Sequence, residues 1–380
     1  MNTLVNEGNS SDFHFMLGNH AVAEGAIAAG CRYFAGYPIT PASEIAERIS
    51  QIMPEVGGKF IQMEDELGSI YSVIGASLAG TKAMTATASA GYDYMQEGIE
   101  FAVATETPLV IVDVMRLRGA EQATQADIMQ VRWGAAGDHE MIVLAPSSVQ
   151  ELFDYTVEAF NLSEKYRNPV VVVSEMTLSL MRERMRIRGP DELNIVNRKH
   201  PKVSPDKFIP FRGEADGVPP MARFGDGYKV LYTINPHDEM GMITGDLETY
   251  GRLYERITDK IKRAVDDIVK YQTYYMDDAD VAVIAYGSES RSALEAVRRA
   301  RDEGIKAGLL KLITVWPFHE RLIRETAEQV KRIIVPEMNL GRYVHEVERA
   351  SECMAKVVSL PLNTGRMHTG EEILNSLRSG

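Results

Sequence analysis

Short apolar segments recur along the first half of the chain, and longer stretches with helical spacing of apolar residues separate them. The pattern predicts strands at 33–35, 60–63, 83–87, 109–114, 141–145 and 170–174. It predicts helices between them at 42–53, 66–79, 92–105 and 149–165. Short apolar strands that alternate with helices are typical of a parallel sheet covered on both faces. We therefore predict a doubly wound α/β domain, in which a ligand binds beyond the carboxyl ends of the strands.

The pattern changes between about Arg186 and Gly227, where prolines and charges replace the periodic apolar positions. Such a segment is typical of a connector that lies on the surface. A charged stretch at 248–275 then predicts one long helix, and strands alternate with helices again from Asp280 onward. We predict a first domain at 1–190, a linker with a long helix at 191–275, and a smaller α/β domain at 276–380.

The composition of the 380-residue chain is that of a globular protein, with 45% hydrophobic and 25% charged residues. The formal net charge of −13 argues against nucleic acid as the main partner, because phosphate binding needs a basic face. No apolar stretch reaches the length of a membrane-spanning helix, and residues 1–12 lack the features of a signal peptide. We therefore expect a cytoplasmic protein without a membrane partner.

The chain holds only two cysteines, Cys31 and Cys353. Two cysteines cannot hold a cubane iron–sulfur cluster or a four-cysteine zinc site within this chain. Gly225-Asp226-Gly227 resembles the start of a magnesium motif, but no second Asn-bearing element follows at a suitable distance. We expect no metal site within this chain.

The turn Gly36-Tyr37-Pro38-Ile39-Thr40-Pro41 follows a predicted strand and precedes a predicted helix. Its two prolines stiffen it, and Pro41 suits a helix start. Thr40 is then held at the carboxyl end of a strand, with its hydroxyl directed at the expected ligand crevice. A Thr in this position also often caps the following helix, and both roles can hold together.

Two further segments place charged side chains at strand ends. In Gln62-Met63-Glu64-Asp65-Glu66, an acidic trio leaves a strand and enters a helix. Acidic residues in a first turn ordinarily interact with the helix dipole, and we expect that of at least two of the three. Arg116 follows the most apolar strand of the chain. An arginine at that depth should be paired or should receive an anion such as a carboxylate.

Together these segments resemble the α subunit of the 2-oxoacid:ferredoxin oxidoreductases. The resemblance extends in order and spacing over 18–30, 37–41, 62–68, 85–91, 130–133 and 145–150, and it continues into the second block. Tyr37-Pro38-Ile39-Thr40-Pro41 is its most specific part. Met63-Glu64-Asp65-Glu66 is most similar to the members that act on 2-oxoglutarate. The resemblance implies a first domain that binds the pyrimidine ring of thiamine diphosphate and a smaller domain like the C-terminal domain of transketolase.

The resemblance also implies roles for individual residues. Glu66 would bond the pyrimidine ring nitrogen of the cofactor and act as the catalytic residue, which requires a partly buried carboxyl. Thr40 would contact the substrate's oxo or carboxylate oxygens, and Arg116 its carboxylate. Tyr37 and Ile39 would line the substrate site, and Pro38 the cofactor site.

The family divides its active site between subunits, which implies partners for this chain. A β subunit would hold the diphosphate of the cofactor, Mg²⁺ and an iron–sulfur cluster, so this chain alone would be inactive. The expected reaction is oxidative decarboxylation of 2-oxoglutarate, with coenzyme A as acyl acceptor and ferredoxin as electron acceptor.

One departure from the family pattern leaves the substrate open. The loop after Arg116 is shorter than usual by several residues, and it carries Arg118, Gln122 and Thr124. A branched-chain 2-oxoacid or pyruvate is therefore an alternative substrate. An assembly or regulatory subunit without catalysis is an alternative of another class, although the presence of Glu66, Thr40 and Arg116 argues against it.

Overall fold

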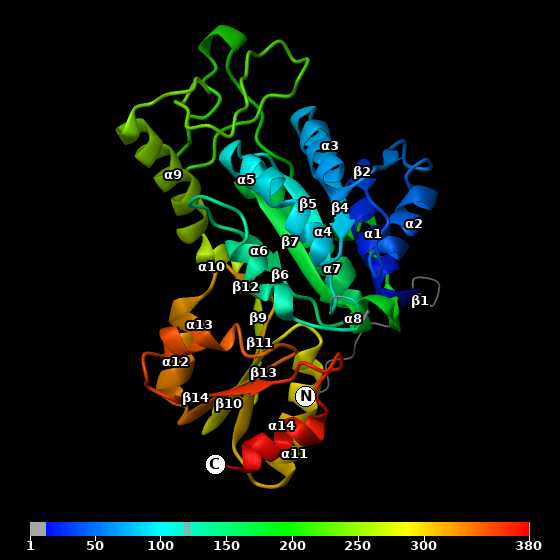
Figure 1. Ribbon diagram of the computed structural model, residues 1–380, viewed down its shortest axis with the longest axis vertical. Coiled ribbons are helices and arrows are strands. Elements are labelled where there is room, and N and C mark those ends of the chain that lie inside the picture. The colour runs from blue at the N-terminus through cyan, green and yellow to red at the C-terminus, as the bar shows by residue number, and fades with distance from the viewer. Residues whose placement is uncertain (1–12, 118, 120–121, 380) are drawn as a thin grey trace.

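The computed structural model describes residues 13–117, 119 and 122–379 of the chain. A larger α/β domain occupies the middle of the molecule, and a smaller one, coloured yellow to red, lies below it (Figure 1). The two predicted α/β blocks are therefore both present. An irregular segment lies at the top, away from the smaller domain, and helix α9 (Leu247–Lys262) runs from it down the left side of the larger domain towards the smaller one (Figure 1).

The larger domain is built on a seven-stranded sheet with the order β12-β6-β7-β5-β4-β2-β3. The strands predicted in the first block are confirmed as β2 (Tyr33–Gly36), β3 (Lys59–Gln62), β4 (Ala83–Thr87), β5 (Leu109–Met115), β6 (Ile142–Leu144) and β7 (Pro169–Glu175). All of these pair in parallel. The seventh strand, β12 (Thr314–Trp316), comes from the second block and pairs antiparallel with β6. Pattern reasoning did not predict this strand.

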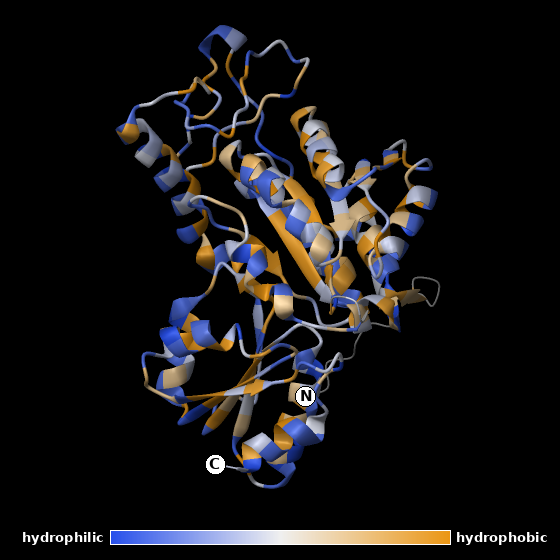
Figure 2. Cartoon of the chain, viewed as in Figure 1, coloured by the Kyte–Doolittle hydropathy of each residue, from blue (hydrophilic) through white to orange (hydrophobic). Residues whose placement is uncertain are grey.

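Helices cover both faces of this sheet, as a doubly wound domain requires. One apolar cluster joins the sheet to α1 (Gly18–Ala28), α2 (Ser43–Ile52) and α7 (Val149–Tyr166). The cluster on the other face includes α3 (Glu66–Leu78) and α5 (Gln96–Ala104), which follows the short α4 (Ala90–Tyr94). Every residue of β5 and β7 is buried, and Figure 2 shows apolar strands between helices with polar outer faces.

Smaller elements complete the larger domain. They are β1 (Phe13–Leu17) and β8 (Arg182–Arg186), which form a separate antiparallel pair, together with α6 (Gln130–Trp133) and α8 (Met176–Leu180). β1 is almost wholly apolar and β8 is charged at every position except Met185, so neither has the alternation that marks a half-buried strand.

The predicted connector is confirmed as irregular chain, broken only by short 3₁₀ turns at Pro190–Glu192 and Pro205–Lys207. The buried Arg167 fastens it to the amino ends of β5 and β7. The Nη1 atom of Arg167 donates to the carbonyl oxygens of Pro219 and Pro220 at 3.1 Å, and its Nε donates to Glu106 O at 2.9 Å. The connector therefore lies away from the carboxyl ends of the strands.

The prediction of one long helix at 248–275 is wrong. Helix α9 spans Leu247–Lys262, the single turn α10 spans Val265–Ile268, and Tyr271–Tyr274 form strand β9. β9 pairs antiparallel with β11 (Ala307–Leu312) at the edge of the second sheet. Aromatic and β-branched residues fit a pleated, half-buried surface, and this tertiary pairing outweighs the helical pattern of the preceding stretch.

The smaller domain has a five-stranded sheet in the order β14-β13-β10-β11-β9. Its strands β10 (Val281–Tyr286), β13 (Arg332–Glu337) and β14 (Lys356–Pro361) are parallel to β11, as predicted. Its helices are α11 (Glu289–Asp302), α12 (Glu320–Gln329), α13 (Val344–Ser351) and α14 (Gly370–Arg378). In the part of the chain that the structure describes, no helix has the length and apolar character needed to cross a bilayer.

Candidate active site

Four neighbouring strands bring the predicted site residues to one edge of the larger sheet. β5, β4, β2 and β3 are adjacent and parallel, so their carboxyl ends lie side by side. The turn 37–41 follows β2, the acidic trio follows β3, residues 88–91 follow β4, and Arg116 follows β5. The predicted segments, separated by up to about eighty positions in sequence, therefore meet where open α/β sheets bind ligands.

The three acidic residues after β3 have different environments. Glu64 and Asp65 are exposed, whereas Glu66 is only 6% exposed. The Oδ1 atom of Asp65 accepts a hydrogen bond from the backbone N–H of Gly68 at 2.6 Å and so caps α3. Asp65 at the N-cap and Glu66 in the first turn thus occupy the expected helix start, and Glu66 is the buried carboxyl of the trio.

The Glu66 carboxylate lies against a turn that only glycine fits. A Cβ atom placed on Gly91 would lie 2.4 Å from Glu66 Oε1 and 2.0 Å from Thr87 Oγ1. No residue that the structure describes gives Glu66 a hydrogen bond or an ion pair, and the buried Thr87 hydroxyl also lacks a partner. Buried polar groups are nearly always hydrogen-bonded, so this arrangement suits a ligand that brings a polar ring atom to Glu66.

The turn after β2 places its residues at the surface of the same edge. Tyr37, Pro38 and Thr40 are exposed, and Ile39 is half-buried. The side chain of Asn19 holds the turn, because its Nδ2 donates to Pro41 O at 2.6 Å. The hydrogen bond from the buried Asn19 thus fixes the end of the turn, while the side chains of Tyr37, Pro38 and Thr40 remain exposed.

The helix-capping role considered for Thr40 is wrong. The residue at the N-cap of α2 is Ala42, and no side chain caps this helix. Thr40 makes no hydrogen bond to any residue in the described ranges. Its hydroxyl is therefore available to another partner, as its role toward a substrate would require.

Arg116 lies half-buried directly beyond β5. Its backbone forms an antiparallel β-bridge with Ala123. Of the loop residues that we expect to influence substrate choice, Arg118 lies outside the described residues, and Gln122 is exposed. Gln122 packs against Gly365 of the smaller domain. A Cβ atom added to Gly365 would lie 2.5 Å from the Cβ atom of Gln122.

The end of this loop is fastened to the smaller domain, which pattern reasoning missed. The Thr124 hydroxyl donates to Met338 O at 3.0 Å, and Gln125 exchanges hydrogen bonds with the backbone of the same residue. Gln125 Nε2 also donates to Glu175 Oε1 at 2.7 Å. Thr124 thus makes a contact between the two domains.

Glu175 gives the interdomain contact a pH dependence. It is fully buried at the end of β7, and burial raises the pKa of its carboxyl to about 7, against an ordinary value of 4.5. Because this carboxyl holds its proton in the folded chain but loses it in the unfolded chain, stability falls as the pH rises from about 4.5 to about 7. We expect the Tm of Glu175→Gln, relative to that of the wild type, to increase over this pH range by on the order of 2 °C. Parallel thermal scans at pH 5 and pH 8 measure the difference, and a constant Tm difference would contradict it.

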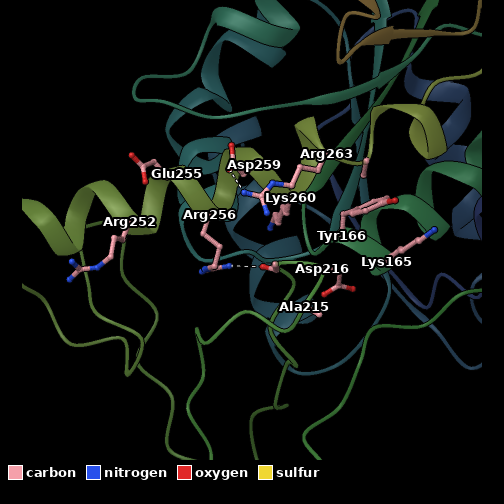
Figure 3. A pocket seen from close by; sticks show the side chains of 12 residues that line it. Lys165, Tyr166, Ala215, Asp216, Arg252, Glu255, Arg256, Asp259, Lys260 and Arg263 are labelled. Carbon is pink, nitrogen blue, oxygen red and sulfur yellow. Dashed lines mark hydrogen bonds and ion pairs between the residues drawn. The ribbon is translucent and has the colours of Figure 1, made fainter.

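A separate cavity of about 520 Å³ lies between α9, the end of α7 and the connector (Figure 3). Several of the charged side chains that line it form ion pairs with other residues of the chain. Lys260 and Arg256 both pair with the fully buried Glu106, at 2.8 and 2.7 Å, and Arg263 pairs with Asp259. The cavity lies at the amino end of β7, away from Glu66, and its ion pairs serve to fasten the connector.

Gly225-Asp226-Gly227 forms an exposed turn. Asp226 accepts a hydrogen bond from Arg223 Nε at 2.8 Å, so its carboxylate serves a local ion pair. Within the described ranges, no group of three or more His, Cys, Asp or Glu side chains is arranged to hold a metal ion.

Comparison with known proteins identifies the family. Residues 24–256 match the family described as pyruvate flavodoxin/ferredoxin oxidoreductase, thiamine diphosphate-binding, which is more than half of the chain. The chain belongs to the 2-oxoacid:ferredoxin oxidoreductase family. Residues 279–373 match its core domain II, described for pyruvate:ferredoxin oxidoreductase. The predicted family and its thiamine diphosphate-binding fold are thereby confirmed.

Similar members of the family include subunits with different substrate names. The 2-oxoglutarate synthase subunit KorA of Methanothermobacter marburgensis is 50% identical over 96% of this chain and 98% of its own length. The ketoisovalerate oxidoreductase subunit VorB of Methanothermobacter thermautotrophicus is 39% identical, with 88% of this chain and 89% of VorB covered. The higher identity thus falls on the 2-oxoglutarate member.

A solved structure of the family has the same architecture. The 2-oxoglutarate:ferredoxin oxidoreductase from Magnetococcus marinus, with 2-oxoglutarate, coenzyme A and succinyl-CoA bound, matches with a TM-score of 0.91 at 31% identity. The match covers 97% of this chain and 65% of the other. The chain therefore spans about two thirds of the length of that family member.

Proposed function

We propose that this chain is the α subunit of a 2-oxoglutarate:ferredoxin oxidoreductase, which converts 2-oxoglutarate and coenzyme A to succinyl-CoA and reduces ferredoxin. The observation that carries the proposal is the buried Glu66 carboxylate, which has no described partner and lies at the edge that also holds Thr40 and Arg116. Packing alone gives no reason for a buried carboxylate without a partner. The identity to KorA relatives supports the choice of substrate.

In the proposed reaction, the cofactor and the side chains at this edge of the sheet have separate roles. Thiamine diphosphate supplies the carbanion chemistry when bound, and the protein positions and polarises it. Glu66 would share a proton with the pyrimidine ring nitrogen. Pro38 would contact the cofactor, and Tyr37 and Ile39 would line the space for the substrate. Thr40 would hydrogen-bond the oxo or carboxylate oxygens.

A β subunit would complete the active site and supply Mg²⁺ and an iron–sulfur cluster. Cys31 is buried and Cys353 is exposed, and neither forms a disulfide. The rim around Glu66 carries exposed apolar side chains, of which Leu67 is 43% and Tyr94 is 70% exposed. A partner that covers this rim would remove apolar surface from water and close the site.

The oxoacid preference of the purified native complex tests the proposal. Reduction of a viologen dye with coenzyme A present would be measured for 2-oxoglutarate, pyruvate and branched-chain oxoacids. We expect kcat/KM for 2-oxoglutarate to exceed the others by at least about tenfold, as a matched charged contact allows. A higher value for a branched-chain acid would instead support the ketoisovalerate alternative. A complex that reduces the dye with none of them would support a non-catalytic subunit.

Arg116 should serve all oxoacids alike. The C1 carboxylate is common to every 2-oxoacid, and a planar guanidinium can bind it with two hydrogen bonds. Arg116→Lys keeps the charge and loses this geometry. We expect kcat/KM to fall roughly thirtyfold for each accepted oxoacid, the usual effect of losing a desolvated charged hydrogen bond. Steady-state kinetics on several oxoacids measure it. If only 2-oxoglutarate were affected, Arg116 would read the distal carboxylate.

A further inference from the structure

The turn after β4 runs between the two proposed binding residues, Glu66 and Arg116. β4 ends at Thr87, and the turn continues through Ser89 to Gly91. The backbone of Gly91 lies against Glu66. Ser89 is 4% exposed and has a φ of 35°, which a residue with a side chain rarely adopts. Such backbone strain persists only where surrounding contacts fix it.

The backbone of Ser89 is fixed by the neighbouring strand. Its N–H donates to Oδ1 of Asp113 at 2.7 Å, and Asp113 pairs with Thr87 across β4 and β5. Asp113 is fully buried, and burial together with the carboxylate of Asp127 raises the pKa of its carboxyl above the ordinary value. Burial thus disfavours the charged form of this carboxyl.

The side chain of Ser89 contacts the proposed substrate residue. Its hydroxyl accepts a hydrogen bond from the backbone N–H of Arg116 at 3.0 Å. The same hydroxyl lies 2.5 Å from Oδ2 of Asp127, to which it can donate. One hydroxyl thus ties the first residue beyond β5 to the turn beyond β4.

We propose that Ser89 is a positioning residue, which holds the backbone of Arg116 so that its guanidinium meets the oxoacid carboxylate. This inference rests on the function proposed above, because it acts through Arg116. Without the hydroxyl, the partly buried N–H of Arg116 loses its acceptor and the start of the loop can shift. Glu66 has no hydrogen bond to Ser89, so the cofactor side should be affected little.

The test compares Ser89→Ala and Ser89→Gly in the assembled complex with the wild type. Both remove the hydroxyl, but glycine also relieves the strain at positive φ. We expect both to raise KM for 2-oxoglutarate about tenfold, the usual cost of a lost hydrogen bond to a buried group. kcat and the affinity for thiamine diphosphate should stay within about twofold. Ser147→Ala is a matched control, because its hydroxyl donates to the carboxylate of Glu151 at 2.9 Å, at the end of β6.

Combination with Arg116→Lys separates positioning from general damage. If Ser89 acts through Arg116, the two effects on kcat/KM should be clearly less than additive in the double variant. Full additivity, an unchanged KM in both Ser89 variants, or a KM restored to normal in Ser89→Gly would each overturn the inference. The last outcome would assign the effect to backbone strain.

Hydrogen exchange gives a readout that needs no activity. The amide of Arg116 should exchange faster in Ser89→Ala than in the wild-type complex, with no change at the end of β6. An unchanged rate at Arg116 would overturn the inference. A wild-type complex that turns over no oxoacid would refute the proposed function, whereas the exchange rate would still decide whether Ser89 holds Arg116.

Discussion

Purified without a partner, the chain should decarboxylate no 2-oxoacid, even with thiamine diphosphate and Mg²⁺ supplied. It contributes Glu66 to the proposed site, but its Gly225-Asp226-Gly227 turn is used in an ion pair with Arg223 and it offers two cysteines in all. Electron transfer to ferredoxin needs a redox centre, and two cysteines cannot hold a cubane cluster. The preparation should also lack the brown absorbance of iron–sulfur proteins.

The measurement is a viologen reduction assay with 2-oxoglutarate and coenzyme A, run on the chain alone and after addition of a purified β subunit. Activity should appear only in the second case. Decarboxylation by the chain alone would mean that a complete thiamine diphosphate site exists within it, and the two-subunit proposal would be wrong. A thermal scan of the isolated chain serves as the control that the inactive sample is folded.

Much of the larger domain follows from local sequence pattern. β4 and β5 are mostly apolar segments between helical stretches, and every residue in them is buried, as expected for strands covered on both faces. β9 and β12 could not be predicted in the same way. β12 has three residues and exists because β6, far away in sequence, offers a free edge, and β9 depends equally on β11. Pairings of this kind carry no periodic signal within the segment itself.

The candidate site was predictable as far as strand order could be assumed. Placing Tyr37–Thr40, Glu66 and Arg116 at strand ends was enough to predict that they meet, because parallel strands end at one edge. The sequence did not distinguish Thr40 as a helix cap from Thr40 as an open hydroxyl, since both need the same residue. Nor did it indicate the hydroxyl of Ser89, because its contact with Arg116 joins two loops across the sheet.

The local pattern of the acidic trio did not single out Glu66, which only the family resemblance indicated. All three residues are equally acidic in sequence, and only burial separates them. Asp65 caps α3 and Glu64 is exposed, which leaves Glu66 facing Gly91 and Thr87. A matched pair of variants therefore exists in one short segment: Glu66→Gln changes the buried carboxyl, and Glu64→Gln changes an exposed one.

Glu66→Gln should reduce turnover of the assembled complex by at least ~100-fold, the usual contribution of a positioned acid or base. Glutamine keeps the size of the side chain and can still hydrogen-bond, but it cannot share a proton with a ring nitrogen. The loss should therefore appear in kcat, with a smaller change in the affinity for thiamine diphosphate, because the hydrogen bond is weakened and not removed. Glu64→Gln should leave turnover within about twofold.

Steady-state kinetics and a thiamine diphosphate titration on both variants measure these effects, and thermal scans establish that each complex is intact. Removing a buried carboxylate without a protein partner should not lower Tm, since no ion pair is broken. A drop in Tm that accompanied the loss of turnover would point to a structural role. Near-normal turnover in Glu66→Gln, with a large loss in Glu64→Gln, would move the catalytic role to Glu64, and normal turnover in both would remove it from this segment.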